Sequence, residues 1–327
     1  MRIAILGAGA TGGLLAVALA EAGHDMSVLV RGPHLAAIAA DGLCLRDPSG
    51  QETVIRLLAT DDPTQLGPQD VLITTLKAPA LAAVIRDLPE TLRGLPVIMA
   101  MNGVFWWYGI GFQPQGVPVD CSLLDPGAVL AGLTDPAQIQ GAIIYATNQV
   151  VAPGVVQNRS MSNRFLIGGP VPSDLSQSLA TRLTSARADV VVAEDIRRQM
   201  WHKLLRNLSS APISVLTGAR VREINGNADT AQLARALFLE GAAVAASHGF
   251  AGLADEVDTV IAPGKGALQV PSMRQDYDLG RPMEIDSMLW IVQQFARAAG
   301  VATPVLDSVL PLVILAAQTT GCYPRPT

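Results

Sequence analysis

Residues 2–12 read RIAILGAGATG, a short apolar run followed by a glycine-rich loop. The apolar run over residues 2–6 predicts a buried parallel strand, and the Ala- and Leu-rich residues 11–22 predict a helix that ends at Gly23. A second strand is expected over residues 26–30. Because a strand, a glycine loop, a helix and a strand in this order form one βαβ unit, the stretch predicts an α/β fold.

Short apolar runs continue to alternate with helical patterns further along the chain. Strands are predicted over residues 71–76 and 96–101, with a helix over residues 80–88 between them. Strands that alternate with helices in this way build a doubly wound parallel sheet. Residues 142–169 contain turn pairs between β-rich runs and predict antiparallel strands, and residues 190–193 predict one more short strand.

The second part of the chain has a different pattern. No strand is predicted there, and helical periodicity runs through residues 196–217, 229–248, 283–299 and 305–318. We therefore expect an N-terminal Rossmann-type domain with a doubly wound parallel sheet over residues 1–195. An all-α C-terminal domain is expected over residues 196–327.

The composition of the 327 residues narrows the class of protein. Half of the residues are hydrophobic and 16% are charged, which is typical of a globular chain with large cores. A formal net charge of -5 argues against a nucleic-acid-binding surface. The three cysteines (Cys44, Cys121 and Cys322) are far apart and predict neither a disulfide framework nor a metal site. We expect a cytoplasmic protein without a membrane span or a bound metal.

The glycine loop carries a candidate phosphate-binding motif. Its pattern, GxGxxG, is weak alone, but here it follows a predicted strand and opens a predicted helix. Gly7 suits the tight turn, Gly9 lets the backbone approach a pyrophosphate, and Gly12 allows close packing of helix on strand. The N–H groups of the helix start, with Ala10 and Thr11, would face the phosphates. The alternative is an Ala/Gly-rich turn that binds no ligand.

Basic and polar residues follow three of the predicted strands. Arg31 follows the second strand where an NAD site usually has an acid, so it favours the 2′-phosphate of NADP, unless it is an ordinary surface arginine. Lys77 and Asn102 follow the strands over residues 71–76 and 96–101, at the edge where ligands of such sheets bind. They are candidate cofactor contacts, and Asn102 also a substrate contact. The alternative for Asn102 is that, with Gly103, it only forms an Asn-Gly turn and contacts no ligand.

Two further clusters lie in the predicted helical domain. Lys203 and Asn207 share one helix face, and a partly desolvated lysine there suits a general acid. A lysine that reaches out to water is the alternative. Glu284 could hold a substrate hydroxyl or merely complement a helix start behind Pro282, and Ser272 could bind a carboxylate. The four histidines (His24, His34, His202 and His248) show no metal spacing and receive no role.

Taken in order, these residues resemble the ketopantoate reductase family, also called 2-dehydropantoate 2-reductase, over essentially the whole chain. The resemblance implies NADPH-dependent reduction of 2-dehydropantoate to pantoate, a step toward pantothenate. It implies Lys203 as the general acid, Glu284 as the group that holds a substrate hydroxyl, and Asn207 and Ser272 as substrate binders. The matching pieces are Gly7/Gly9/Gly12, Arg31, Lys77, Asn102-Gly103, Pro153-Gly154, Trp201-x-Lys203-Leu204-x-x-Asn207, Ser272-Met273-x-x-Asp276 and Arg281-Pro282-x-Glu284-Ile285-Asp286.

The chain departs from the family pattern at three places. It has Ala211 where the family often has a second asparagine, Met283 where a threonine is common, and an aromatic run over residues 104–108. The run either walls a pocket, seals an interface or packs in a core. These changes leave open a reductase of a less polar 2-oxo acid. A non-catalytic NADP-binding regulator is a second alternative function. If the protein forms a homodimer, we expect the C-terminal helices to form its interface.

Overall fold

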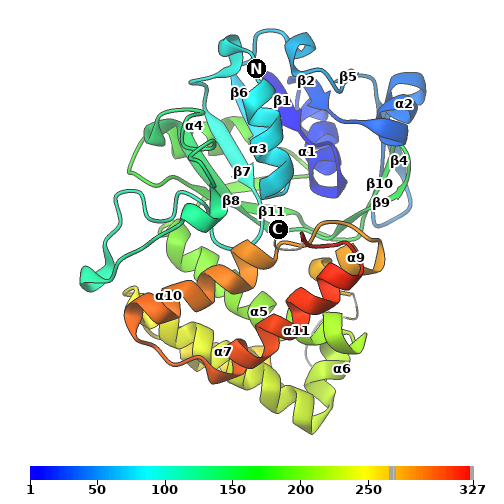
Figure 1. Ribbon diagram of the computed structural model, residues 1–327. Coiled ribbons are helices and arrows are strands. Elements are labelled where there is room, and N and C mark those ends of the chain that lie inside the picture. Colours follow the sequence, from blue (N-terminus) through cyan, green and yellow to red (C-terminus); the bar gives the residue numbers. More distant parts are fainter. Residues whose placement is uncertain (265–267, 269, 325–327) are drawn as a thin grey trace. The chain divides into compact units, whose positions relative to one another are not determined.

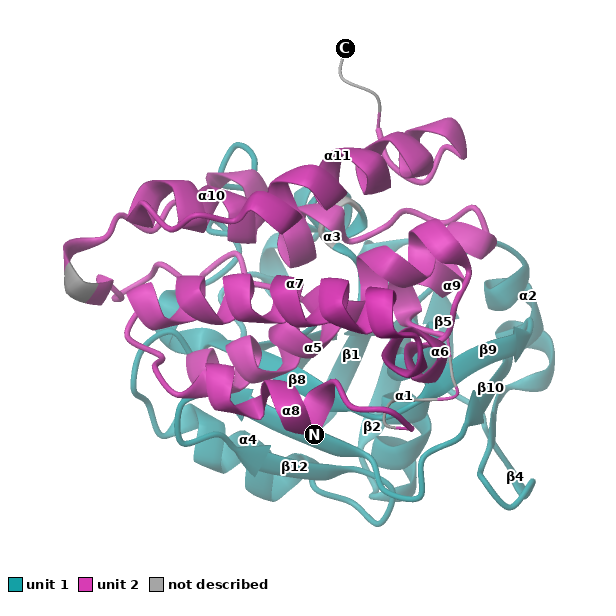
Figure 2. Cartoon of the chain, turned by 90° about the horizontal axis from the view of Figure 1, so that it is seen from below, with its two compact units in different colours: residues 1–101, 125–196 teal, residues 102–124, 197–327 magenta. Residues whose placement is uncertain are grey.

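The computed structural model describes residues 1–264, 268 and 270–324 (Figure 1). The chain divides into two units, one of residues 1–101 and 125–196 and the other of residues 102–124 and 197–327 (Figure 2). The division after residue 196 lies within one residue of the boundary that the sequence predicted. The segment 102–124, however, lies in the helical unit, whereas the sequence analysis assigned it to the first domain.

The first unit is built on a sheet of eight strands. Every neighbouring pair in it is parallel except β8 and β11. The mixed α/β fold with a doubly wound parallel sheet is therefore confirmed. In spatial order the strands are β12 (Asp189–Val192), β11 (Arg164–Gly168), β8 (Ile139–Tyr145), β7 (Val97–Ala100), β6 (Val71–Thr74), β1 (Arg2–Leu6), β2 (Asp25–Leu29) and β5 (Leu58–Thr60).

A smaller sheet of four strands belongs to the same unit. Its order is β4 (Glu52–Ile55), β3 (Leu43–Arg46), β10 (Val155–Asn158) and β9 (Asn148–Ala152). The antiparallel pairing predicted for residues 142–169 is confirmed for β9 with β10 and for β8 with β11. Strands β3, β4 and β5 were not predicted from the sequence; each has only three or four residues, and β4 and β5 contain exposed positions.

Helix α1 (Ala10–Glu21) packs against strands of both sheets. Its residues from Gly12 to Leu19 are all buried, as expected for a helix that is apolar on every side. A Cβ atom on Gly13 would lie 2.6 Å from Val156 Cγ2 of the smaller sheet, so the helix approaches that sheet too closely for a larger residue. The helix that follows the glycine loop is therefore tightly packed at Gly13.

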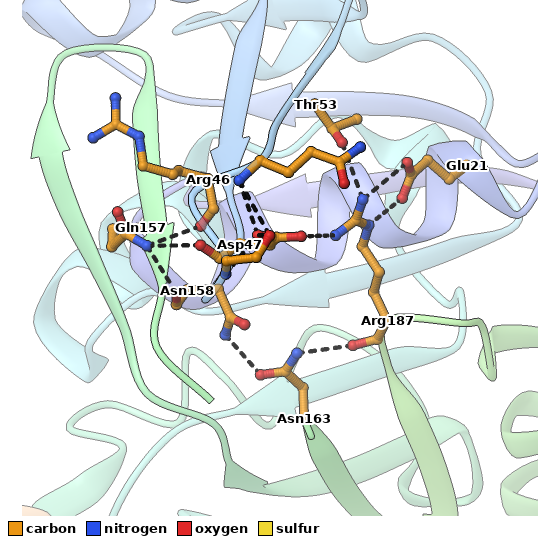
Figure 3. Close-up of polar contacts among 10 residues, drawn as sticks. Glu21, Arg46, Asp47, Thr53, Gln157, Asn158, Asn163 and Arg187 are labelled. Carbon is orange, nitrogen blue, oxygen red and sulfur yellow. Dashed lines mark hydrogen bonds and ion pairs between the residues drawn. The ribbon is translucent and has the colours of Figure 1, made fainter. Parts of the chain in front are cut away.

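Arg187 fastens the far end of α1 to the smaller sheet (Figure 3). Its Nε donates to Glu21 at 2.5 Å, at the last residue of the helix, and its Nη2 donates to the Thr53 hydroxyl of β4 at 3.0 Å. Asp47 lies in the turn between β3 and β4, and its Oδ2 is 3.9 Å from Arg187 Nη1. One guanidinium therefore joins three segments that are distant in sequence and limits how α1 can move against the sheets.

The remaining helices of the first unit are α2 (Gly32–Asp41), α3 (Ala78–Asp87) and α4 (Leu175–Leu183). The second unit is helical, and α7 contacts α6, α10 and α11 within it. No strand occurs among its described residues, in agreement with the prediction, and no helix in the described parts of the chain is long and apolar enough to cross a membrane. Its helices are α5 (Ile196–Thr217), α6 (Val221–Gly226), α7 (Ala228–Ser247), α8 (Val257–Val260), α9 (Ser272–Asp278), α10 (Ile291–Ala299) and α11 (Pro304–Thr319).

The aromatic run over residues 104–108 lies in the core of the helical unit. None of its side chains is more than 6% exposed, so the packing alternative describes it and the pocket-wall alternative does not. The Tyr108 hydroxyl accepts a hydrogen bond from Trp201 Nε1 at 2.8 Å and shares a second hydrogen bond with His248 Nδ1 at 2.9 Å. Burial lowers the pKa of His248 to about 4, which keeps its ring neutral and able to accept.

Tyr108→Phe should therefore destabilise the helical unit with little change in shape. Removal of the hydroxyl leaves the Trp201 indole N–H and the His248 Nδ1 buried without this partner, which costs about 1–3 kcal/mol. Chemical denaturation should show this loss in the free energy of unfolding. Phe112→Leu is the control, since it alters the same aromatic cluster without removing a hydrogen bond. A Tyr108→Phe variant as stable as the wild type would contradict the network.

Candidate active site

The glycine loop is held by contacts that explain two of its three motif glycines. Gly7 has a positive φ of 99°, and its N–H donates to the Leu29 carbonyl of β2 at 2.9 Å. A Cβ on Gly12 would lie only 2.1 Å from the Gly7 carbonyl oxygen. The Thr75 hydroxyl donates to that same oxygen at 2.5 Å. Gly7 and Gly12 are thus required by the chain's own packing.

Gly9 differs from those two glycines, and this difference tests the fit of a dinucleotide. A Cβ placed on Gly9 would meet no atom within 4 Å, so nothing in the protein explains the missing side chain. Gly9 precedes the first residue of α1, and no acidic residue lies in the first turn. The N–H groups at a helix start have no partners within the helix and attract anions. Open space at this backbone fits a pyrophosphate, as the motif requires.

Arg31 and Lys77 are the residues that immediately precede two helices of this unit. Arg31 precedes α2, is exposed, and makes no hydrogen bond or ion pair with the described part of the chain. Lys77 precedes α3 and is half-buried. The residues just before it contact the glycine loop, since Leu76 would lie 2.7 Å from a Cβ on Gly7. Both predicted cofactor contacts therefore follow strands of the main sheet, as the sequence indicated.

Three candidate residues of the helical unit form one chain of hydrogen bonds. Lys203 Nζ donates to Asn102 Oδ1 at 2.9 Å, and Asn102 Nδ2 donates to Glu284 Oε2 at 3.2 Å. The amide of Asn102 uses its oxygen on a cation and its nitrogen on a carboxylate, which fixes its orientation. The structure thus brings together residues from a loop, from helix α5 and from the segment before residue 285.

The surroundings of Lys203 change its acidity. Loss of hydration lowers the pKa of the Lys203 ammonium from 10.5 to about 8, while the charge of Glu284 acts in the opposite direction. Desolvation wins because it penalises the charged form directly. Lys203 as a whole residue is half-buried. A cationic amine with a pKa near 8 is a competent proton donor at neutral pH.

The Asn102-Gly103 turn is anchored on Ser287. Gly103 has a positive φ of 82°, and a Cβ there would lie 2.3 Å from the Ser287 carbonyl oxygen. That oxygen accepts from the Val104 N–H at 2.8 Å, and the Ser287 hydroxyl donates to the Asn102 carbonyl at 3.3 Å. Ser287 lies in a π-helical turn over residues 286–290, a feature frequent at functional sites.

The helix after Glu284 begins later than the sequence predicted. We expected a helix over residues 283–299 with Pro282 and Glu284 in its first turn. Helical backbone instead begins at Ile285, and the Met288 N–H donates to the Glu284 carbonyl at 3.2 Å. Glu284 therefore lies directly before the first turn, and the proposed helix-start role of Pro282 is wrong.

The end of the described chain braces the segment that carries Glu284. The Met283 N–H donates to the Cys322 carbonyl at 2.9 Å, which ties this segment to the residue after α11 and its following turn. Two residues after Glu284, the Asp286 carboxylate accepts a hydrogen bond from the Tyr323 hydroxyl. Burial raises the pKa of Asp286. The position of the Glu284 backbone therefore depends on residues close to the C-terminus.

The other predicted substrate contacts are placed but not joined to this network. Asn207 lies one helical turn after Lys203 on α5, and Ser272 is the first residue of α9. Neither side chain hydrogen-bonds to the described residues, so both stay predictions. Ala211 and Met283 are buried at 1% and 6% exposure. The sequence analysis missed Thr75 and Ser287, because a hydroxyl after a strand or within a helix gives no motif.

Comparison with known proteins identifies the family. The family described as "Ketopantoate reductase PanE/ApbA" matches residues 3–105, and its C-terminal domain, "Ketopantoate reductase PanE/ApbA C terminal", matches residues 195–317. A 2-dehydropantoate 2-reductase of Mesorhizobium japonicum is 38% identical over 99% of this chain and 100% of its own length. This chain belongs to the ketopantoate reductase family. It is therefore an oxidoreductase, and the resemblance seen in the sequence is confirmed.

Solved structures agree with this membership. A candidate ketopantoate reductase from Ralstonia solanacearum MolK2 superposes with a TM-score of 0.86 at 33% identity, covering 98% of this chain and 99% of that one. A D-mandelate dehydrogenase bound to NADH and anilino(oxo)acetate superposes with a TM-score of 0.83 over 98% and 99% of the two chains. At 19% identity, that second likeness shows a shared fold.

Proposed function

We propose that this ketopantoate reductase family member catalyses the NADPH-dependent reduction of 2-dehydropantoate to pantoate, in pantothenate formation. The observation that carries the proposal is the hydrogen-bonded chain of Lys203, Asn102 and Glu284, with the lowered pKa of Lys203. The membership of the family supports the proposed substrate class, a small 2-oxo acid.

The chain's own residues then act by holding the substrate and moving one proton. NADPH, when bound, supplies the hydride that adds to the keto carbon. Lys203 donates its proton to the keto oxygen, so that the carbonyl becomes an alcohol, and the amine later regains a proton from solvent. Asn102 holds the amine in place, and Glu284 accepts a hydrogen bond from a substrate hydroxyl. Asn207 and Ser272 bind the rest of the 2-oxo acid in this proposal.

The proposed choice of NADPH over NADH rests on Arg31. No acidic residue follows β2, where a carboxylate would bind the ribose 2′-hydroxyl of NADH. An exposed guanidinium occupies that position and can pair with a 2′-phosphate through two hydrogen bonds. Lys77, which precedes α3, is a second proposed contact to the cofactor, and Gly7, Gly9 and Gly12 shape the loop for the phosphates.

Arg31→Ala should weaken NADPH binding much more than NADH binding. Charge-assisted hydrogen bonds contribute about 1.5–3 kcal/mol, so the dissociation constant for NADPH should rise roughly 10- to 100-fold. Fluorescence titration with both nucleotides measures the ratio. Arg86→Ala, which removes an exposed arginine from the end of α3, is the control and should leave both affinities unchanged. An equal loss for NADH and NADPH would rule out the 2′-phosphate role.

A substrate panel tests the proposed reaction. Steady-state turnover of NADPH and of NADH should be measured with 2-dehydropantoate and with less polar 2-oxo acids. We expect the highest kcat/KM for 2-dehydropantoate with NADPH. Ala211 and Met283 are buried apolar residues at two departures from the family pattern, and they motivate the alternative of a less polar substrate. Preference for such an acid would establish that alternative, and NADPH binding without any turnover would indicate a regulator.

A further inference from the structure

His34 makes two hydrogen bonds that define one state of its ring. It lies in the first turn of α2, half-buried, with Nδ1 2.8 Å from the Gly154 backbone nitrogen and Nε2 2.8 Å from the Ala8 carbonyl oxygen. The Gly154 N–H can only donate, so Nδ1 must be the unprotonated acceptor. Nε2 then carries the proton and donates to Ala8. A single neutral tautomer satisfies both contacts.

The two partners of His34 come from distant parts of the first unit. Ala8 lies within the glycine loop, and Gly154 lies in the turn between β9 and β10 of the smaller sheet. Gly154 has a positive φ of 75°, and a Cβ there would lie 3.1 Å from Ala37 Cβ of α2. The turn therefore packs tightly on α2 and offers the ring a fixed support. The same ring lies three residues after Arg31, in the helix that Arg31 precedes.

The hydrogen bond from His34 to the Ala8 carbonyl sets the direction of the Gly9 N–H, which could donate to a phosphate. The Ala8 carbonyl and the Gly9 N–H belong to one planar trans peptide, so they point in opposite directions. A donor that holds the carbonyl toward α2 turns the Gly9 N–H away from it. The neighbouring Gly7 carbonyl is held in the same manner by the Thr75 hydroxyl. Two successive carbonyls of the loop are thus held by side-chain donors, so the Ala8 and Gly9 N–H groups point away from those donors.

We propose that His34 is a positioning residue for the dinucleotide: it orients the Ala8–Gly9 peptide so that its N–H faces a phosphate. The inference rests on the proposed function, because it needs a dinucleotide on the glycine loop. The open space beside Gly9 gives independent support, since the peptide that His34 orients is the one at which no protein atom fills the missing side chain. His34 itself need not touch the ligand.

Two substitutions separate the two bonds of the ring. A glutamine amide reaches about as far as Nε2 and can still donate to Ala8, whereas an asparagine amide ends near Nδ1 and can accept only from Gly154. We expect His34→Gln to bind NADPH within about threefold of the wild type. His34→Asn should raise the dissociation constant for NADPH on the order of tenfold, the loss of one hydrogen bond. Isothermal titration gives these constants, and thermal unfolding gives Tm.

His24→Asn is the matched control. His24 belongs to the same unit and also uses both ring nitrogens, one at the Met1 amine and one 2.9 Å from the Arg182 carbonyl, and neither hydrogen bond is to the glycine loop. Its substitution should lower Tm without changing NADPH affinity. The inference is overturned if both His34 variants bind NADPH as the wild type does. It is also overturned if both lose affinity equally while Tm falls. A wild-type chain that binds no dinucleotide overturns the proposed function as well.

Discussion

Lys203→Met should lower kcat for reduction of the 2-oxo acid by a factor on the order of 10²–10⁴, the usual contribution of a general acid. Methionine keeps an unbranched stem of similar size but has no proton to donate. The affinity for NADPH should be nearly unchanged, because none of the proposed phosphate contacts is altered. Single-turnover kinetics at saturating NADPH isolates the chemical step from substrate binding.

The matched control for this substitution is Arg206→Gln on the same helix. Arg206 is exposed, and its guanidinium lies 3.7 Å from Glu256 rather than near Asn102. Its loss should leave kcat within about twofold, as expected for a weak surface ion pair. A Lys203→Met variant that turns over at the wild-type rate would remove Lys203 from the mechanism. A variant that had lost its cooperative thermal transition would instead show that Lys203 supports the fold.

Gly9→Ala and Gly12→Ala should fail in different ways, although both lie in the glycine loop. In Gly12→Ala the new Cβ would lie 2.1 Å from the Gly7 carbonyl oxygen, so the loop must move. Overpacking of this kind typically costs 1–3 kcal/mol of stability, and about 3 kcal/mol is expected here because the obstacle is backbone. In Gly9→Ala the new Cβ meets no protein atom, and stability should change by less than about 1 kcal/mol.

Gly9→Ala should nevertheless weaken cofactor binding, although it leaves stability nearly unchanged. The Cβ in Gly9→Ala occupies space that a pyrophosphate needs, so the dissociation constant for NADPH should rise at least tenfold, or about 1.4 kcal/mol. Gly226→Ala is the control, because its Cβ also meets no atom within 4 Å but lies in α6 of the helical unit. A stable Gly9→Ala variant that binds NADPH like the wild type would show that the open space has another cause.

Much of the fold follows from local patterns in the sequence. The strand before Gly7 and the apolar helix after Gly12 are recognisable because residues 3–6 and 13–19 are all buried, which requires continuous apolar runs. The short strands β3, β4 and β5 escape detection, because β4 and β5 are largely exposed or half-buried and the buried part of β3 is only three residues long. The late start of the helix at Ile285 escapes too, because the residues before it are held by a contact with the Cys322 carbonyl, which lies far away in the sequence.

Local sequence patterns predict less of the candidate site than of the fold. Asn102 is 101 positions from Lys203 and 182 from Glu284, so spacing along the chain cannot predict their hydrogen bonds. Only the ordered resemblance to a family named them together. The aromatic run over residues 104–108 was equally ambiguous, because a buried tryptophan and a pocket-lining tryptophan look identical in a sequence. His34 was passed over, since its partners are backbone groups, which no residue pattern reveals.

The pH dependence of kcat/KM for the 2-oxo acid with NADPH tests the central role of Lys203 most directly. Burial lowers the pKa of Lys203 to about 8, and the protonated amine is the proposed donor. The account predicts a plateau at low pH and a fall of tenfold per pH unit above about 8, with this fall absent from the residual activity of Lys203→Met. A wild-type profile that stays flat from pH 6 to about 10, or a fall near 8 that persists in the variant, would contradict it.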